Sequence, residues 1–349
     1  MGLLGIVVKK TVEMIISGVL LVAAHKYFNK NHEATDPVTT IARRFGRPPF
    51  VTNSYEDKIA GGVIDPDDIK VDFNSIGGLT DIKKALMDSV ILPLTRPDLF
   101  AHGKLLGPQK GVLLYGPPGT GKTMIAKAIA KQAGAVFINV RVSELMSKWF
   151  GEAPKLVTAV FTLANKLQPA IIFIDEVDSF LGQRSNSDHE VMTNMKTEFM
   201  SMWDGFTTDQ NGTVMVLAAT NRPEVLDEAI LRRFSESFEI GLPNRKERAS
   251  ILQIILKDEN VENVVDYDYL AGLCEGCAGS DLSKLCKDTA LLLLGEYLEA
   301  VNRGDSPPGL RPMAQSDFEK VFRSSKSTKT AAEAYSHRAS KSSSSSSRR

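Results

Sequence analysis

Short apolar runs alternate with helical patterns through the middle of this chain. The runs occupy residues 111–115, 136–140, 170–174 and 214–219. Runs that are apolar throughout, rather than at every second position, are typical of strands covered on both faces of a sheet. Their alternation with helices predicts an α/β domain over residues 71–243, in which helices flank a parallel sheet.

From residue 244 onward the strand pattern is replaced by a helical one. Helical patterns cover residues 245–257, 267–274, 281–300 and 315–322. They predict a small helical domain over residues 244–322. The stretch 281–294 is apolar on every side of a helix, so we expect that helix to be mostly buried.

The segments beside these two domains show less periodicity. Residues 29–70 contain scattered prolines and paired glycines, and we expect an irregular linker there. A helix is then expected over residues 81–92, with Thr80 as its N-cap and Pro93 as its stop. Residues 323–349 are rich in Ser, Lys and Arg, which predicts a disordered tail.

Residues 1–28 are apolar almost throughout, with Lys9 and Lys10 as an interruption. A helix over this stretch is long enough to cross a bilayer, which requires about twenty residues, and we interpret it as a membrane anchor. Lys9 and Lys10 precede the apolar part of this stretch, whereas Lys26, Lys30, Arg43, Arg44 and Arg47 follow it, so the positive-inside rule predicts that the rest of the chain faces the cytosol. A cleavable signal peptide and an amphipathic helix on the membrane surface are the alternatives.

Composition narrows the choice of partners and compartment. The 42 basic and 42 acidic residues cancel, so no overall field attracts nucleic acid, and no nucleic-acid partner is expected. The 3 cysteines, Cys274, Cys277 and Cys286, are an odd number, which favours a reducing compartment. No fourth Cys or His ligand lies near them, so we interpret them as ordinary helix and turn residues.

A glycine-rich loop lies between the first apolar run and a helical pattern. The loop consists of Gly116, Pro117, Pro118, Gly119, Thr120, Gly121, Lys122 and Thr123. A strand, a glycine loop and a helix in this order are the context of a phosphate-binding P-loop, whose backbone N–H groups and helix N-terminus face the anion. Lys122 is expected to contact the β- and γ-phosphates, and Thr123 to offer its hydroxyl to Mg²⁺. The sequence therefore predicts a nucleoside triphosphate site.

Two later apolar runs end in residues that complete such a site. The run 170–174 leads into Asp175 and Glu176. Asp175 is expected beside the metal, and Glu176 is expected to polarise the attacking water. The run 214–219 leads to Asn221, whose amide is expected near the γ-phosphate.

Two further features each leave two interpretations open. Arg232 and Arg233 follow a short helical pattern; they could compensate the helix dipole or neutralise transition-state charge in a neighbouring subunit. Trp149 and Phe150 stand beside a glycine between polar residues. They could begin a helix with one aromatic buried, or form an exposed aromatic grip on a loop.

Over about residues 70–322 these motifs resemble the AAA family of ATPases. The resemblance rests on the P-loop, the acidic strand end and the segments 218–221, 231–234 and 279–282. It implies a homohexameric ring that hydrolyses Mg·ATP at sites between subunits. It also implies that Ile76 and Gly77 contact the nucleotide.

The resemblance further assigns roles around the ring. It makes Arg232 and Arg233 trans-acting fingers, Asn221 a sensor, and the segment 204–206 an inter-subunit signalling element. Trp149 and Phe150 become a first pore loop that grips an extended polypeptide, and residues 184–190, with His189, become a second. One departure is Glu236-Ser237, where relatives often carry another basic residue; it leaves only the arginine pair to reach the neighbouring nucleotide.

Within the family, residues 76–79, 92–94 and 204–206 are similar to the clade that holds spastin, katanin, fidgetin and thorase. A membrane span joined to one AAA module resembles the extractases of this clade, which remove mislocalised tail-anchored proteins from the outer mitochondrial and peroxisomal membranes. The alternative is a microtubule-severing ATPase of the spastin/katanin type, although residues 29–70 are short for the helical module of such enzymes. A membrane protease is excluded, since His32-Glu33 and His189-Glu190 lack the second histidine of a zinc motif.

Overall fold

A six-stranded sheet forms the centre of the molecule in a computed structural model, which describes residues 37–46, 50–100, 109–146, 152–182, 190–208, 213–305 and 308–324. Its strands are β1 (Val63–Ile64), β2 (Gly111–Tyr115), β3 (Val136–Val140), β4 (Ala170–Ile174), β5 (Val214–Thr220) and β6 (Glu236–Glu239). They lie in the order β1-β3-β4-β5-β2-β6, and each neighbouring pair is parallel except β1 with β3. The parallel sheet predicted from the apolar runs is confirmed.

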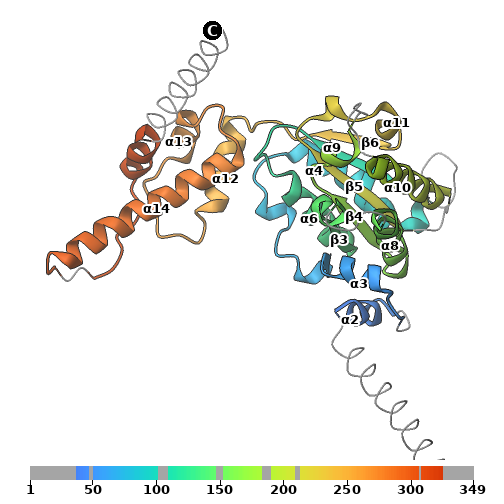
Figure 1. Ribbon diagram of the computed structural model, residues 1–349. Coiled ribbons are helices and arrows are strands. Elements are labelled where there is room, and N and C mark those ends of the chain that lie inside the picture. Colours follow the sequence, from blue (N-terminus) through green and yellow to red (C-terminus); the bar gives the residue numbers. More distant parts are fainter. Residues whose placement is uncertain are drawn as a thin grey trace, which may run out of the picture.

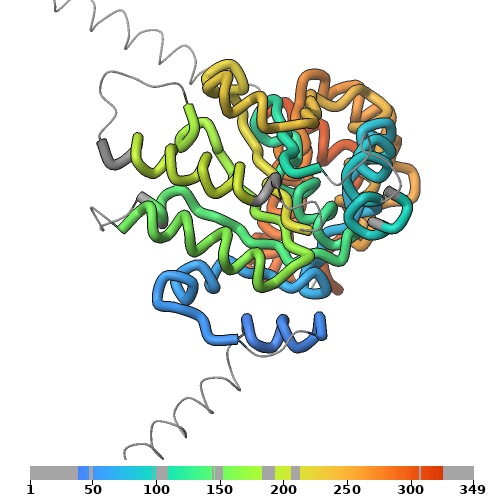
Figure 2. The backbone as a smooth tube through the Cα atoms, turned by 90° about the vertical axis from the view of Figure 1, so that its right-hand side faces the viewer, coloured from blue at the N-terminus to red at the C-terminus, as the bar shows by residue number. Residues whose placement is uncertain are grey.

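Helices cover both faces of this sheet, as Figures 1 and 2 show. The helices of this lobe, besides short 3-10 turns, are α2 (Pro37–Arg44), α3 (Ser54–Ala60), α4 (Thr80–Leu86), α5 (Leu92–Thr95), α6 (Lys122–Ala133), α7 (Val142–Met146), α8 (Ala153–Lys166), α9 (Asp178–Leu181), α10 (Glu190–Thr208) and α11 (Glu228–Leu231). Alternate strand residues face opposite layers. Leu113 packs in the core with α8 and α10, whereas Leu114 packs in the core with α4 and α6.

The prediction of an irregular linker over residues 29–70 is wrong for much of that range. Helices α2 and α3 pack onto the layer of α8, and β1 extends the sheet beyond β3. Glu56 of α3 is only 1% exposed, and its carboxylate accepts hydrogen bonds from Lys166 at 2.7 Å and Thr162 at 2.9 Å. A buried carboxylate needs such partners, so this segment belongs to the folded body.

The helix expected over residues 81–92 also differs from expectation. Thr80 is already helical, and the N-cap is Leu79, which adopts the left-handed conformation with φ 56° and no side-chain cap. The chain then continues through a π-helical stretch, Met87–Ile91, into α5, so Pro93 does not end the helix. A π-turn interrupts the regular hydrogen-bond ladder, which makes a proline in the following turn tolerable.

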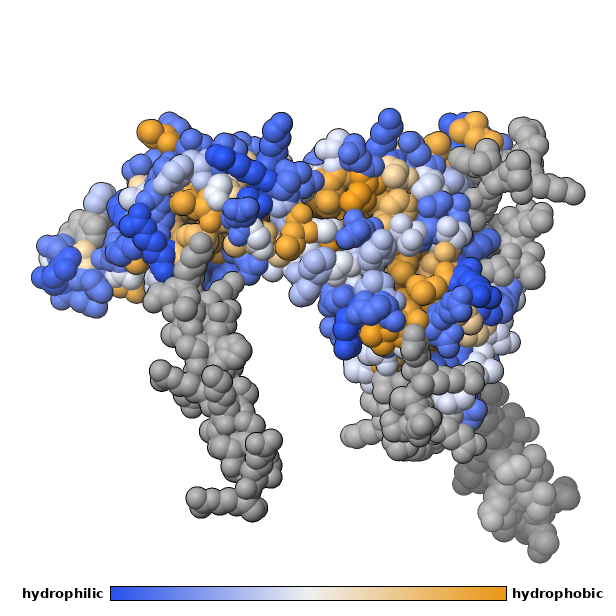
Figure 3. Space-filling view, turned by 90° about the horizontal axis from the view of Figure 1, so that it is seen from above, coloured by the Kyte–Doolittle hydropathy of each residue, from blue (hydrophilic) through white to orange (hydrophobic). Residues whose placement is uncertain are grey.

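The C-terminal lobe is helical, and Figure 3 shows it beside the sheet lobe, each with apolar patches on a largely hydrophilic surface. It contains α12 (Arg245–Ile255), α13 (Tyr267–Leu273), α14 (Gly279–Asn302) and a helix over residues 315–324. Its own core includes Leu252, Leu270, Leu282 and Phe318. All three cysteines are free, and Cys274 and Cys286 are buried there.

Helix α14 is less buried than its apolar sequence predicts. Leu282, Leu285 and Leu293 are buried, but Leu291 is 53% exposed and Leu298 50% exposed. Figure 1 shows the C-terminal part of α14 extending past the other helices of its lobe, so only one side of it is covered. The predicted membrane anchor, residues 1–28, lies outside the described residues, and so do residues 325–349 of the tail predicted over residues 323–349; residues 323 and 324 end the last helix instead. Within the described part of the chain, no helix is both long and apolar enough to cross a bilayer.

Candidate functional site: the carboxyl edge of the sheet

The predicted P-loop lies at the edge of the sheet where β2, β4 and β5 end. These strands are hydrogen-bonded neighbours that run parallel, so their carboxyl ends meet. The loop turns at Gly116, with φ 142°, and a Cβ there would collide with the carbonyl of Ile240. Gly121, with φ 101°, caps α6. Both positions require glycine, and the α6 N-terminus faces the loop as an anion site does.

Lys122 is held inside this loop. Its side chain belongs to a residue only 7% exposed, and Nζ donates to the carbonyl oxygens of Gly116 at 2.9 Å and Pro117 at 2.7 Å. Burial lowers the pKa of the Lys122 amine, and the charge of Asp175 opposes that shift. A desolvated cation surrounded by loop backbone suits the recognition of phosphate oxygens, which are stronger partners than neutral carbonyls.

Thr123 and Asp175 meet across the same edge. The Thr123 hydroxyl donates to Asp175 Oδ2 at 2.7 Å, and Asp175 Oδ1 accepts the N–H of Glu176 at 3.0 Å. A hydroxyl and one carboxylate, completed by substrate phosphates, are a usual Mg²⁺ donor set. The described residues contain no group of 3 or more His, Cys, Asp or Glu side chains that could form a metal cage by themselves. The geometry therefore fits a metal that arrives with a nucleotide.

Glu176 stands next to this pair in an unusual backbone conformation. Its φ is 50°, and its side chain is exposed while Ile174 and Val177 are buried. A positive φ at a non-glycine residue costs free energy and is concentrated at functional sites. The turn thus leaves the acidic side chain of Glu176 exposed, in the position directly after the Asp175 that bonds to Thr123.

The turn that carries Asn221 is fastened to α9. Thr220, at the end of β5, donates to Asp178 Oδ1 at 2.7 Å, and Arg222 Nη2 donates to Asp178 Oδ2 at 2.9 Å. Asn221 lies exposed between these two anchors. Sequence reasoning did not identify Asp178, although a carboxylate three residues after Asp175 was visible. Its position makes it the group that orients the Asn221 turn.

The C-terminal lobe approaches this edge at two points. The Ser280 N–H donates to the carbonyl of Gly119 at 3.0 Å. Gly77 lies against α12 so closely that a Cβ would come within 2.7 Å of the backbone of Ile251, and the Leu79 N–H donates to Glu247 at 2.9 Å. The segment that holds Ile76 and Gly77 therefore belongs to the sheet lobe and directly contacts the C-terminal lobe.

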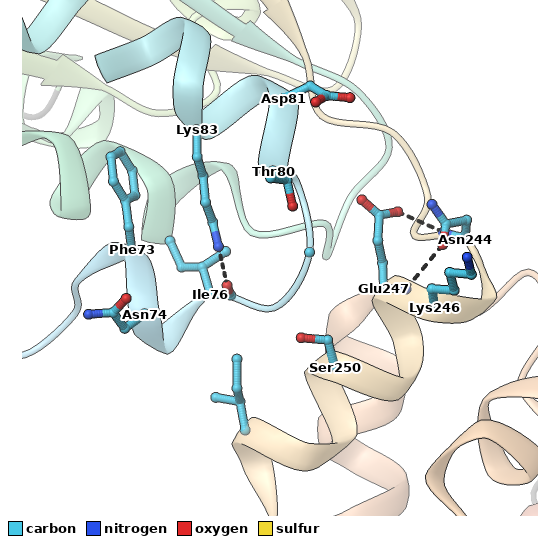
Figure 4. Close-up of a pocket in the computed structure, with 12 residues that line it drawn as sticks. Phe73, Asn74, Ile76, Thr80, Asp81, Lys83, Asn244, Lys246, Glu247 and Ser250 are labelled. Carbon is cyan, nitrogen blue, oxygen red and sulfur yellow. Dashed lines mark hydrogen bonds between the residues drawn. The ribbon is translucent and has the colours of Figure 1, made fainter. Parts of the chain in front are cut away.

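A groove of about 570 Å³ opens beside that segment (Figure 4). It is lined from one lobe by Phe73, Asn74, Ile76, Gly78, Thr80, Asp81 and Lys83, and from α12 and its N-cap by Asn244, Lys246, Glu247, Ser250 and Ile254. Figure 4 shows Lys83 reaching the carbonyl of Ile76, to which it donates. Burial lowers the pKa of Lys83, and the charges of Asp72 and Glu247 oppose the shift. The P-loop residues do not line this groove, so it borders the predicted nucleotide site through Ile76 alone.

Arg232 and Arg233 have different surroundings. The Arg232 side chain is 75% exposed and pairs at 2.8 Å with Glu228, one turn earlier. The Arg233 side chain is 26% exposed and forms a bidentate pair with Asp204 of α10, at 2.8 and 2.7 Å. Arg233 lowers the pKa of the Asp204 carboxyl through these bonds, and the pKa of Arg233 is raised in turn.

Comparison with known proteins decides the family. The profile described as "ATPase family associated with various cellular activities (AAA)" matches residues 112–242. The human "Outer mitochondrial transmembrane helix translocase" is 47% identical over 301 residues, which cover 86% of this chain and 83% of the relative. This chain belongs to the AAA ATPase family. The Caenorhabditis elegans "Mitochondrial sorting homolog" is 43% identical over 293 residues, or 84% of each chain.

A solved AAA structure supports the fold assignment. The crystal structure of the FIGL-1 AAA domain in complex with ADP matches with a TM-score of 0.68 and 35% identity, over 79% of this chain and 92% of that one. As an AAA ATPase, the chain is an ATP hydrolase that carries a nucleotide site.

The residues predicted for the pore lie outside the described part of the chain. They are Trp149, Phe150 and His189. Their assignment stays a prediction, while every predicted nucleotide-site residue lies within the described segments.

Proposed function

We propose that this AAA ATPase is membrane-anchored, assembles as a ring of six copies, and uses ATP hydrolysis to extract mislocalised tail-anchored proteins from a membrane. The observation that carries the proposal is the 47% identity to outer mitochondrial transmembrane helix translocases over 86% of this chain. Identity of this extent covers the sheet lobe and most of the helical lobe, not only the nucleotide motifs. The proposed location is the outer mitochondrial membrane, the peroxisomal membrane, or both, with the ATPase facing the cytosol.

Within the proposed cycle, each residue at the sheet edge has a separate role in ATP binding or hydrolysis. Residues 116–123 hold the phosphates, and Ile76 and Gly77 contact another part of the nucleotide. Thr123 and Asp175 would hold Mg²⁺, which supplies charge neutralisation at the phosphates when it is bound. Glu176 accepts a proton from the attacking water, and Asn221 keeps that water or the γ-phosphate in place.

The mechanical step is assigned to residues that meet only in a ring. Arginine from one subunit stabilises charge on the nucleotide of the next, so turnover depends on assembly. Trp149, Phe150 and His189 would line the central pore, where aromatic side chains grip an extended polypeptide without reading its sequence. Repeated hydrolysis then pulls the client through the ring.

The test is a client trap. Full-length protein carrying Glu176→Gln is purified from cell membranes in ATP, so that clients engaged before hydrolysis stay bound. The matched control is Lys122→Ala, which is expected to lose ATP and therefore its clients. Recovery of single-span tail-anchored proteins with Glu176→Gln and not with Lys122→Ala supports the extractase.

A second candidate function is microtubule severing. It is favoured by the similarity of residues 76–79, 92–94 and 204–206 to the clade that holds spastin and katanin. In the same trap, recovery of tubulin without membrane clients would replace the extractase with this alternative.

A further inference from the structure

One carboxylate of the C-terminal lobe bonds directly to the segment of the sheet lobe that is expected to contact nucleotide. We infer that Glu247 is a latch between the lobes, whose bond to the Leu79 N–H holds Ile76 and Gly77 in the shape that binds nucleotide. Glu247 is then a positioning residue for nucleotide binding, although it lies outside every nucleotide motif. The inference rests on the proposed contact of Ile76 and Gly77 with nucleotide, and deepens it by naming what keeps that segment in place.

The two carboxylate oxygens of Glu247 accept N–H groups from different lobes. Oε1 accepts the N–H of Leu79 in the sheet lobe at 2.9 Å, and Oε2 accepts the N–H of Asn244 in the C-terminal lobe at 2.9 Å. Asn244 is the N-cap of α12, and its side chain accepts the Glu247 N–H at 3.1 Å, so the two residues form a capping box (Figure 4). One oxygen is therefore anchored to α12 while the other reaches across to the sheet lobe.

The bond to Leu79 lies where helix α4 begins. Leu79 is the N-cap of α4, and its own side chain makes no cap hydrogen bond. In a capping box the N–H of the N-cap residue is taken up by a polar side chain at the third helical position, but in α4 that position is Ile82. Glu247 supplies the missing acceptor from the other lobe, at a helix end that favours negative charge.

The backbone around Leu79 depends on this support. Gly78 has φ 68° and Leu79 has φ 56°. A left-handed conformation at a leucine costs free energy and persists only where the surrounding structure enforces it. Part of those surroundings is α12, since a Cβ added at Gly78 would lie 2.5 Å from the Cγ of Glu247. Loss of the Glu247 side chain would therefore release the backbone that joins Gly77 to α4.

Lys83 connects the start of α4 to Ile76. Its ammonium group donates to the carbonyl oxygen of Ile76 (Figure 4). Burial lowers the pKa of Lys83, and the charges of Asp72 and Glu247 oppose that shift, so the carboxylate of Glu247 also acts on this ammonium group. The position of Ile76 thus depends on where α4 begins, and the start of α4 depends on Glu247.

This arrangement couples nucleotide binding to the relative position of the lobes. A movement that separates α12 from the sheet lobe breaks the bond from Leu79 to Glu247 but leaves the bond from Asn244 intact. Coupling between two equilibria is reciprocal. If closed lobes hold Ile76 and Gly77 in their binding shape, bound nucleotide must in turn hold the lobes closed.

The first test compares full-length Glu247→Ala with full-length Asn244→Ala in detergent, at a temperature where both are folded. Each variant loses one half of the same capping box and should lose a similar amount of stability, but only Glu247→Ala loses the bond to Leu79. The readouts are the Kd for ADP, and kcat and KM for Mg·ATP.

The two variants should differ in affinity. For Glu247→Ala we expect the Kd and KM to rise about tenfold or more, the effect of losing one hydrogen bond to a charged group. Its kcat should stay close to that of the wild type, because a loss of uniform binding changes KM alone. Asn244→Ala should keep the wild-type Kd. Equal Kd values in the two variants, or a wild-type Kd in Glu247→Ala, would overturn the inference.

A second measurement needs no substitution and so does not depend on how a variant folds. It is hydrogen exchange at the amides of Leu79 and Asn244 in the wild type, which both donate to Glu247 but belong to different lobes. ADP at about 100 times its Kd should slow exchange at Leu79 about 10- to 100-fold, because it stabilises the closed lobes. Exchange at Asn244 should not change. No slowing at Leu79, or equal slowing at both amides, would exclude the latch.

Ile76→Ala separates the latch from the proposed contact on which it rests. A wild-type Kd for ADP in Ile76→Ala would remove the contact of Ile76 with nucleotide, and the latch with it. A raised Kd in Ile76→Ala beside a wild-type Kd in Glu247→Ala would remove the latch alone. Recovery of no membrane client in the trap would remove the extractase and leave the latch untouched.

Discussion

The phosphate-binding edge and the arginine loop, residues 232–234, hold their charged side chains in different ways. At the edge, Lys122 is 7% exposed and Thr123 bonds directly to Asp175, so the groups for binding are assembled within one chain. At the loop, the Arg232 side chain is 75% exposed and pairs with Glu228, one turn earlier in the same chain. A single chain therefore assembles the groups that nucleotide binding requires, whereas in the proposed ring fast hydrolysis would need a charge supplied by a second copy.

The largest expected effect tests this division directly. Arg232→Ala should lower kcat about 10³-fold or more, the range for loss of an arginine finger, and keep nucleotide affinity. Mixing it with Lys122→Ala subunits should restore activity, because some interfaces then combine an intact P-loop with an intact arginine. ATP turnover after subunit exchange is the measurement.

The matched control for that mixture is Lys122→Ala with Glu176→Gln. Both variants are defective on the same side of an interface, so no combination of them is complete and no recovery is expected. If Arg232→Ala with Lys122→Ala also stays inactive under conditions where the subunits exchange, Arg232 acts in its own subunit and the comparison fails.

Glu176→Gln should have the next largest effect. The amide keeps the shape of the side chain but cannot accept a proton, so kcat is expected to fall about 10²- to 10⁴-fold. Nucleotide affinity should persist, because Lys122, Thr123 and Asp175 are untouched. Asp175→Asn is the contrasting variant: it weakens the donor set expected for Mg²⁺ and should reduce Mg-dependent binding itself. Equal binding defects in the two variants would contradict separate roles.

Local patterns were sufficient for the strands and the loop of the nucleotide edge. Continuous apolar runs gave the four central strands to within a residue, and the fixed spacing of residues 116–123 placed Lys122 and Thr123 correctly on the N-terminus of α6. By contrast, β6 has alternating partly buried and exposed residues at the sheet edge and no apolar run. Helix α3 was missed although Asn53 and Glu56 form a capping box, a signal readable from sequence.

The arginine loop could be predicted only in part. Spacing marked Arg232 and Arg233 as special but could not distinguish them, because the distinction comes from a partner 29 positions away in sequence. The same limit applies to Asp178, whose role depends on β5 and α9 lying together. The exposed leucines of α14 show the same limit, because a sequence pattern does not tell which face of a helix packs against another element.

A smaller effect is expected where the second lobe closes over the nucleotide edge. Gly77→Ala places a methyl group within 2.7 Å of the Ile251 backbone, and overpacking of this kind costs about 1–3 kcal/mol. The free energy of unfolding should fall, and nucleotide affinity with it. In Gly295→Ala the new methyl meets nothing within 4 Å inside helix α14, so a gain of about 0.5–1 kcal/mol is expected. The measurement is denaturant unfolding of both variants. Equal losses of unfolding free energy in Gly77→Ala and Gly295→Ala would contradict the close approach of Gly77 to Ile251.

The smallest effect concerns the pH dependence of the Asp204–Arg233 pair. The pKa of Asp204 is lowered below its ordinary 3.8 by the bonds from Arg233. A carboxyl with a depressed pKa contributes stability above its unfolded pKa and loses it as the pH falls through the folded value. Because the Asp204 side chain is 53% exposed, the contribution should stay below about 1 kcal/mol.

Comparing melting temperatures of wild type and Asp204→Asn against pH measures this contribution. The wild type should be slightly more stable at neutral pH, and the gap should close only in acid, below pH 3.8. A gap that persists unchanged in strong acid would mean that the asparagine disturbs packing rather than charge. In that case a loss of turnover in Asp204→Asn would report damaged packing of α10 and not the loss of the ion pair with Arg233.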